Sequence, residues 1–241
     1  YNSRSPEMTI TTRRLHKAAR IILIGAPGVG KGTQTERLLT RFPELASISS
    51  GDLLRENVRN KTPLGLKAEA TIQAGNLVPD SMILDLISSE FKSKGWLSSA
   101  PTSSISPSAS FILDGFPRTA TQALSLDSLV PINFVVHLVT PPSIILSRIS
   151  SRWVHEPSGR VYNTEFNAPK VPGRDDVTGE PLTQREDDSI ETWKQRLSKF
   201  EETSRALLDH YQSKGCLWRV EGNSSDEISP KLFAKIEKKF C

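Results

Sequence analysis

Short apolar runs alternate along the chain with segments whose apolar residues recur at helical spacing. Four of the runs are typical of buried parallel strands. They are "RIILIG" (20–25), "FILD" (111–114), "INFVVHLV" (132–139) and the weaker "CLWRV" (216–220). Helical patterns occupy 80–91, 119–129, 142–152 and 189–213. Buried strands that alternate with helices predict a doubly wound α/β sheet that binds its ligands at the carboxyl ends of the strands.

Two stretches interrupt this alternation. The segment "KSKGWLSSAPTSSISPSAS" (92–110) is rich in Ser and Pro, and it predicts a passive surface loop. Residues 153–188 are rich in Gly, Pro, Asp and Thr and contain short β-prone pieces such as "RVYN" (160–163). Because this segment lies between two predicted helices, we expect a small β-rich lid on a core made of 20–152 and 189–241.

Length and composition are those of an ordinary globular protein. The 241 residues fit one domain with an insertion, and 37% of them are hydrophobic. No apolar stretch approaches the roughly 20 residues that a spanning helix needs, so no membrane insertion is expected. Cys216 and Cys241 are the only cysteines, which argues against a disulfide scaffold and a cysteine-rich zinc site. The net charge of +4 allows an anionic partner without identifying it.

Residues 1–19 read as a basic amino-terminal segment. The chain begins at Tyr1, so "YNSRSPE" is interpreted as a remnant in front of a native start at Met8. From Met8 onward there is no acid as far as the first strand, while four basic residues accumulate. They are Arg13, Arg14, Lys17 and Arg20. This composition fits a mitochondrial import segment and equally a solvated lead into the first strand.

The stretch "GAPGVGKGTQ" (25–34) joins the first predicted strand to a helical pattern, as a phosphate-binding loop does. Such a loop points backbone N–H groups at an anion, and the helix dipole adds to the attraction. Lys31 supplies a mobile positive charge. The next residue is Gly32, where most phosphate loops carry the Ser or Thr hydroxyl that holds magnesium. A plain strand–helix turn would rarely assemble this whole pattern.

Two other classes of phosphate-loop protein fit the sequence poorly. A regulatory GTPase needs an Asn-Lys-x-Asp motif, but "NKTP" (60–63) lacks the Asp and "DVTG" (176–179) falls inside the predicted lid. A nucleic-acid-dependent ATPase would concentrate basic and aromatic residues in one stripe, whereas here the basic residues stand at motif ends. We therefore expect no nucleic-acid partner.

Arginines stand beside short motifs at the ends of several predicted elements. In "SSGDLLR" (49–55) Ser50 is a candidate helix cap, and "LDGFPRT" (113–119) places Asp114 at the carboxyl end of a buried strand. The arginines are Arg55, Arg118, Arg148, Arg152, Arg185 and Arg196. A single arginine is usually a solvated surface residue. Several of them beside a phosphate loop favour phosphoryl transfer, where catalysis is mostly positioning and charge stabilisation.

Six motifs, in order, resemble the signatures of the adenylate kinase family and span about residues 20–215. They are "GAPGVGKGTQ", "SSGDLLR", "GNLVPD", "LDGFPRTATQA", "RWVHEPSGRVYN" and "DDVTGEPLTQREDD". The sequence of the two lid motifs and the double serine of "SSGDLLR" resemble those of the long-lid mitochondrial members of the family, particularly the fungal ones. The resemblance implies a phosphate-loop parallel sheet flanked by helices, a helical insertion at about 50–79 that binds the monophosphate, and a lid at 153–188.

The resemblance also implies a role for each matching residue. In catalysis, Lys31 would stabilise the transferred phosphoryl group, Asp114 would hold magnesium-bound waters, and four arginines would clamp phosphates: Arg118, Arg152, Arg185 and Arg196. Gly32 is then the family's normal residue. The donor site would comprise Gly28, Gly30, Lys31, Gly32, Thr33, Arg148 and Tyr162, with Arg148 stacked on the base. The AMP site would comprise Ser50, Arg55, Val78, Gly115, Arg118, Gln122, Arg185 and Arg196.

In the lid, a hydrogen-bonded network would replace the zinc site of some family members. Its residues would be His155, Ser158, Asp175, Thr178 and Asp187, with Asp187 orienting the lid arginines. Trp153 departs from the family pattern, because many bacterial members carry arginine there. The resemblance therefore implies Mg²⁺ with the nucleotide and no zinc.

The predicted function is transfer of the γ-phosphoryl group of a nucleoside triphosphate to AMP. GTP is favoured as the donor, with ITP and ATP as further donors. This preference rests on the resemblance to the mitochondrial type and on the import-like amino terminus. The nearest alternative is an ATP:AMP kinase, followed by a UMP/CMP kinase or a nucleic-acid-dependent ATPase. We expect a monomer in the mitochondrial matrix, with the cytoplasm as the alternative location.

Overall fold

The computed structural model describes residues 10–73, 78–97, 105–164, 167–184 and 189–241. Five strands form its main sheet: β1 (Arg20–Ile24), β2 (Ala46–Ser49), β3 (Phe111–Asp114), β4 (Phe134–Val139) and β7 (Leu217–Glu221). The helices are α1 (Lys31–Arg41), α2 (Ser50–Arg59), α3 (Pro63–Gln73), α4 (Asp80–Ser93), α5 (Ala120–Leu129), α6 (Pro142–Ser150), α7 (Ile190–Ser213) and α8 (Ser225–Phe240).

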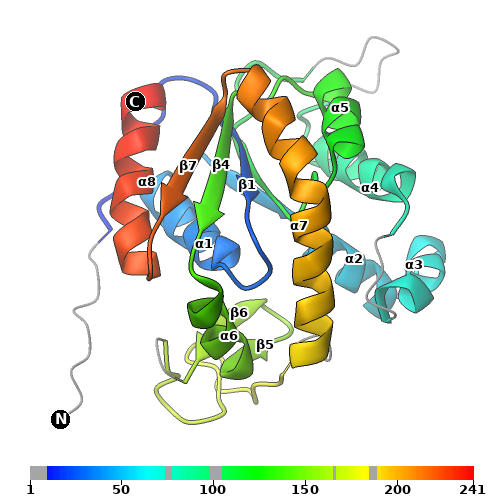
Figure 1. The fold of residues 1–241 in the computed structure, drawn as a ribbon, viewed down its shortest axis with the longest axis vertical. Helices are drawn as coiled ribbons and strands as arrows, with labels where there is room; N and C mark the ends of the chain where they lie inside the picture. The colour runs from blue at the N-terminus through cyan, green and yellow to red at the C-terminus, as the bar shows by residue number, and fades with distance from the viewer. Residues whose placement is uncertain (1–9, 74–77, 98–104, 165–166, 185–188) are drawn as a thin grey trace.

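The main sheet has the strand order β2-β3-β1-β4-β7, and every pair in it is parallel. Its central strand is β1, in which Ile22 pairs in register with Leu113 on one side and Val135 on the other. The carboxyl ends of the strands therefore meet at one edge, where the phosphate loop leaves β1. Figure 1 shows this edge below the arrowheads of β4 and β7. The predicted α/β fold is confirmed.

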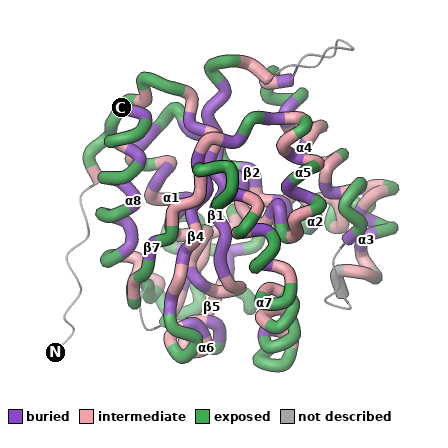
Figure 2. The backbone as a smooth tube through the Cα atoms, turned by 45° about the horizontal axis from the view of Figure 1, so that its top comes forward, coloured by how far each residue is buried: buried purple, intermediate pink, exposed green. Residues whose placement is uncertain are grey.

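Successive side chains of the strands enter two separate cores, because side chains alternate between the faces of a sheet. Ile22 and Leu113 belong to one core, which α4, α5 and the carboxyl half of α7 cover. Ile21 and Ile112 belong to the other, which α1, α6 and α8 cover. Figure 2 shows the buried residues gathered in the central strands and on the inner sides of these helices. Burial on both faces explains why the strands read as continuous apolar runs.

A second, smaller sheet lies between α6 and α7. It consists of the antiparallel strands β5 (Arg152–His155) and β6 (Arg160–Asn163), and a bridge between Val154 and Thr183 extends it. In Figure 1 this sheet lies below the carboxyl edge of the main sheet, beside α6 and the start of α7. This position faces the phosphate loop.

The amino-terminal segment packs on the core from Ile10 onward. The Arg13 amide donates to the carbonyl of Arg41 at the end of α1, at 2.7 Å. The His16 amide donates to the carbonyl of Phe240 at the end of α8, at 2.8 Å. Ile10 and Leu15 contact the core that α1 and α8 share. This part of the segment is thus tied to two helices instead of being a solvated lead.

Three local predictions need correction. Ser49, not Ser50, caps α2, since its side chain accepts from the Asp52 amide, and Ser50 is a buried first helical residue. The segment 92–110 is not simply a surface loop, because Trp96 stacks on Phe111 at 5.5 Å between ring centroids. Helix α8 was absent from the predicted elements. Among the described residues, no helix is long and apolar enough to cross a membrane.

Candidate active site

The phosphate loop is a tight turn between β1 and α1 that only glycine can build at its sharpest point. Gly28 has φ +84°, a conformation that L side chains rarely adopt. A Cβ atom there would lie 2.8 Å from side-chain atoms of Ile145 and Ile149. The loop therefore rests directly on α6. Gly30, Gly32 and Thr33 continue the loop into α1, and together with Gly28 they line a large cavity that is described below.

Two side chains from distant elements fix the loop by its backbone carbonyls. The Trp193 indole N–H, at the start of α7, donates to the Pro27 carbonyl at 2.9 Å, and the ring is buried. The Arg148 guanidinium donates to the Val29 carbonyl at 3.1 Å and to the Asn223 carbonyl at 2.8 Å. Arg148 thus joins the loop to the turn before α8. Trp193 was not predicted, because an indole that serves a backbone carbonyl leaves no motif.

Lys31 lies at the centre of a group of charges. Its Nζ donates to the Gly25 carbonyl at 2.9 Å and to the Ala26 carbonyl at 3.2 Å. Burial lowers the pKa of Lys31 to about 8; the charge of Asp114 opposes this shift, and three arginines reinforce it. These are Arg118, Arg196 and Arg152. Three of the four predicted phosphate-clamping arginines therefore surround Lys31, although they come from separate parts of the chain.

Asp114 ends β3 beside the phosphate loop and is in register with Leu23 of β1 and Ser49 of β2. Burial raises the pKa of Asp114, while Lys31 lowers it and the neighbouring Asp52 raises it further. The described residues contain no group of three or more His, Cys, Asp or Glu side chains placed to hold a metal ion. Two carboxylates near a lysine fit a magnesium ion held mainly by nucleotide phosphates and waters, with Asp114 as the partner of those waters.

The other end of the site is built from α2 and the turn after β3. Arg55 forms an ion pair with Asp52 one turn earlier on α2. Gly115 has φ +81°, and a Cβ atom there would lie 2.8 Å from the Ser50 hydroxyl. The Arg118 Nε donates to the Gly115 carbonyl at 2.7 Å. Together these contacts bring α2 and the Arg118 turn against each other.

The predicted residues Gln122 and Val78 lie behind this end of the site. The Gln122 side chain, only 2% exposed, accepts from the Arg118 amide at 2.6 Å through Oε1 and donates to Asp80 at 2.6 Å through Nε2. Val78 is buried in the core cluster that also contains Leu54. Asp80 was not predicted as a site residue, although it belongs to the quoted motif "GNLVPD".

One cavity of about 1750 Å³ connects these parts. Its wall includes the phosphate loop, Arg55 on α2, Arg118, Arg196 on α7, and Gly159 between β5 and β6. Sites for one small molecule usually measure roughly 300–1,000 Å³. The cavity is therefore large enough for two nucleotides placed end to end across the phosphate loop.

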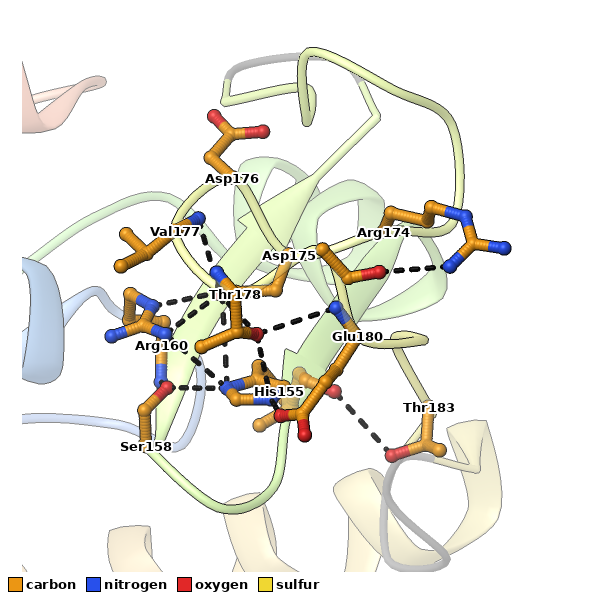
Figure 3. A network of polar contacts seen from close by, with 12 residues as sticks. His155, Ser158, Arg160, Arg174, Asp175, Asp176, Val177, Thr178, Glu180 and Thr183 are labelled. Atoms are coloured by element: carbon orange, nitrogen blue, oxygen red, sulfur yellow. Dashed lines mark hydrogen bonds and ion pairs between the residues drawn. The ribbon is translucent and has the colours of Figure 1, made fainter.

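The small sheet is held by a buried polar network around Asp175 (Figure 3). Asp175 accepts from both the Nε and a terminal nitrogen of Arg160, at 2.8 and 2.7 Å, and from the Thr178 amide at 2.8 Å. These bonds, with that of Arg160 the strongest influence, hold the pKa of Asp175 far below its usual range. A carboxylate so bonded stays ionised, and it joins β6 to the turn at 175–178.

His155 forms the second half of the network. One ring nitrogen lies 2.7 Å from the Ser158 hydroxyl, and the other lies 2.6 Å from Glu180. His155, Ser158, Asp175 and Thr178 are thus brought together as predicted. Arg160 and Glu180 were missed. Glu180 is separated by 25 residues from His155, and the sequence gives no spacing rule that connects them.

Three predicted residues need a comment. Arg185 and Asp187 lie outside the described residues. Tyr162 lines the cavity, but its hydroxyl donates to Asp175 at 2.8 Å, so its polar group belongs to the Asp175 network and is not directed at a nucleotide.

Comparison with known proteins agrees with this geometry. The sequence model described as "Adenylate kinase" matches residues 23–216. The chain is 49% identical over 231 residues to "GTP:AMP phosphotransferase, mitochondrial" of Saccharomyces cerevisiae, covering 94% of this chain and 95% of the relative. It is 41% identical over 216 residues to the Drosophila melanogaster protein of the same name, covering 90% and 94%. The chain belongs to the adenylate kinase family, whose members are nucleoside monophosphate kinases.

Proposed function

We propose that this protein transfers the γ-phosphoryl group of GTP to AMP, giving GDP and ADP. The observation that carries the proposal is the convergence of Lys31, Asp114 and three arginines on one phosphate loop, inside a cavity with room for two nucleotides. Phosphoryl transfer needs positive charge around the transferred group and a site that excludes water. The names of the yeast and fly relatives support GTP and AMP as the substrates.

In this mechanism, Lys31 exchanges the Gly25 and Ala26 carbonyls for phosphate oxygens and stabilises the charge that moves during transfer. Arg118, Arg152 and Arg196 hold the phosphates of donor and acceptor from three directions, and Arg55 adds a charge on the AMP side. Bound magnesium would neutralise donor phosphate charge, and Asp114 would orient its waters. Arg185 is assigned to the same clamp by its motif alone.

Substrate binding divides along the cavity. We assign the donor phosphates to Gly28, Gly30, Gly32 and Thr33, and the donor base to the end where Arg148 lies. We assign AMP to the opposite end of the site, where the predicted AMP-binding residues lie. These residues are Ser50, Arg55, Val78, Gly115, Arg118 and Gln122.

Residues 153–188 would act as the lid, with the rest of the chain from residue 20 as the core. The network of His155 and Asp175 makes the lid a rigid unit without a metal, so that it can close as one body and exclude water. A fluorescent pair on Val171, which is exposed within 153–188, and on Ser47 should move closer on addition of a dinucleoside polyphosphate that spans both sites. An unchanged distance would remove the lid from the mechanism.

The donor preference is tested by steady-state kinetics with AMP fixed and GTP, ITP or ATP varied. Guanine and adenine present opposite donor–acceptor patterns, so polar groups that pair with one are left unpaired by the other. We expect the highest kcat/KM with GTP and the lowest with ATP. If ATP equals or exceeds GTP, the donor assignment is wrong, while transfer to AMP stands. Rapid phosphorylation of UMP or CMP, with AMP a poor acceptor, would instead overturn the acceptor.

The cellular setting is a further part of the proposal. The relatives are named as mitochondrial, so we place the protein in the mitochondrial matrix. We further propose that it acts as a monomer. Fractionation with a matrix marker and sedimentation of the purified protein test the two statements.

A further inference from the structure

The Gln122 side chain is held in a single orientation by two different partners. Its Oε1 faces the backbone N–H of Arg118 at 2.6 Å, and its Nε2 faces Oδ1 of Asp80 at 2.6 Å. A backbone N–H can only donate and a carboxylate can only accept. Rotation of the amide by 180° would therefore set N–H against N–H and oxygen against oxygen. The amide is fixed by its partners and not by packing alone.

Among the described residues the two amide atoms have no other partners, so the fixed amide keeps one free acceptor lone pair and one free N–H group. Its oxygen bonds the backbone of Arg118, which lines the cavity together with Gly115 and Pro117 at the end that we assign to AMP. An amide with this pair of groups is complementary to adenine, which offers an amino N–H at position 6 beside a ring nitrogen acceptor. A base with oxygen at position 6 would bring that oxygen against the amide oxygen.

We propose that Asp80 is a positioning residue that sets the preference for adenine in the acceptor, by holding the Gln122 amide with its oxygen toward Arg118. Asp80 is the first residue of α4, whereas Gln122 lies in the first turn of α5. The Asp80–Gln122 bond therefore joins two elements that are 42 residues apart. This inference rests on the proposed function, because it requires AMP as the acceptor.

The decisive measurement compares AMP with IMP as acceptor, since IMP replaces the 6-amino group by oxygen and leaves the ribose phosphate unchanged. In Asp80→Ala the Arg118 bond alone opposes rotation of the amide, so the flipped amide, with its oxygen away from Arg118, should become populated. The ratio of kcat/KM for AMP to that for IMP should fall roughly tenfold, the scale of one well-placed bidentate pair. The loss should appear mainly in KM, because Asp80 does not touch the transferred phosphoryl group.

Two further variants separate orientation from charge. Asp80→Asn keeps an oxygen that accepts from Gln122 and should retain most of the selectivity, whereas a purely electrostatic role would make it as poor as Asp80→Ala. In a Gln122→Ala background, Asp80→Ala should no longer change the AMP:IMP ratio, because the two residues act as one unit. Asp85→Ala, exposed on the same helix, is the matched control and should leave the ratio unchanged.

Several outcomes would overturn the inference. An unchanged AMP:IMP ratio in a folded Asp80→Ala protein would do so, as would an equal fall in the Gln122→Ala background. Thermal melting of each variant identifies a loss of fold, and Asp80→Asn then carries the test. A wild-type enzyme that phosphorylates UMP or CMP but not AMP would show instead that the proposed function is wrong, which is a different result.

Discussion

Replacing Lys31 with methionine should remove activity and yet raise the stability of the ligand-free protein. The phosphate loop holds this lysine half-buried and close to Arg118, Arg152 and Arg196, and its pKa falls from an ordinary 10.5 to about 8. A lowered pKa means that the folded protein disfavours the charged form of the lysine. Methionine has a similar length and no charge to bury, so this unfavourable term disappears.

The size of the effect follows from the pKa. A change from 10.5 to about 8 corresponds to about 3 kcal/mol, which is an upper limit because water reaches the cavity. The variant also loses the bonds to Gly25 and Ala26, which offsets part of the gain, roughly 1 kcal/mol per bond. We expect a net stabilisation of about 1 kcal/mol, or roughly 2–4 °C in melting temperature for a protein of this size.

The pH dependence has a definite sign. Below pH 8 the lysine is charged in both the folded and the unfolded protein, so the full penalty is present. Between pH 8 and 10.5 the unfolded chain binds more protons than the folded one, and wild-type stability rises relative to the variant. The advantage of Lys31→Met should therefore be largest at pH 7 and shrink by pH 9.5.

Differential scanning calorimetry at pH 7 and pH 9.5 measures the difference in stability between Lys31→Met and the wild type. Lys92→Met, on the exposed side of α4, is the control. Coupled kinetics should show turnover reduced on the order of 10²-fold or more, as when a preorganised charge is lost. A ligand-free variant that melts well below wild type at pH 7 would refute the stability argument. Near-normal turnover would remove Lys31 from the mechanism.

Three further changes test other parts of the site. Arg118→Ala should reduce turnover on the order of 10²-fold with little change in melting temperature, measured by coupled kinetics and calorimetry, because its charge serves the phosphates. Trp193→Phe removes the indole bond to Pro27 and should cost about 0.5–1.5 kcal/mol in denaturant unfolding, with a higher KM for the donor. Asp175→Asn should speed proteolysis within 153–188 at pH 7. Because the fold lowers the pKa of Asp175, proteolysis of the same segment in the wild type should become faster only as the pH falls below the ordinary aspartate range. Elemental analysis of the wild type should find no stoichiometric zinc, and a tightly held zinc would contradict this reading of the lid.

The sequence predicted β1, β3, β4 and β7 because burial on both faces leaves continuous apolar runs, whereas the edge strand β2 ("ASIS") leaves no such run. "FILD" matches β3 residue for residue, and "CLWRV" lies within one residue of β7. Helix α8 was missed although its buried residues recur at helical spacing, because Pro230 lies inside it and a proline normally marks the end of a helical pattern. The capping residue of α2 could not be chosen between Ser49 and Ser50, because the choice depends on where β2 stops.

Motifs predicted site residues that carry charge, but not the residues that hold them in place. Lys31, Asp114 and Arg118 stand in motifs with a recognisable order. Trp193 acts on a backbone carbonyl, and Asp80 acts on a side chain in another helix. Such supporting contacts depend on the packed fold, so the spacing of residues along the chain does not reveal them.

Under the proposed function, the distribution of charge in the site would link substrate binding to closure of the lid. Lys31 belongs to α1, Arg118 to the turn after β3, Arg152 to the first position of β5, and Arg196 to α7. In the ligand-free protein the three arginines repel Lys31, which is why they lower its pKa.

Phosphate oxygens placed among Lys31 and the three arginines attract all four cations. The favourable binding free energy is therefore largest when the four cations are close together. Arg152 is the first residue of β5 and directly precedes the proposed lid at 153–188, so we infer that bound phosphates would favour the arrangement in which this lid approaches α1. A ligand can shift a conformational equilibrium only through such a difference in affinity between states. Under the proposed function, closure would follow from where the cations are placed, and a nucleotide with fewer phosphates should close the lid less completely than one that reaches all four.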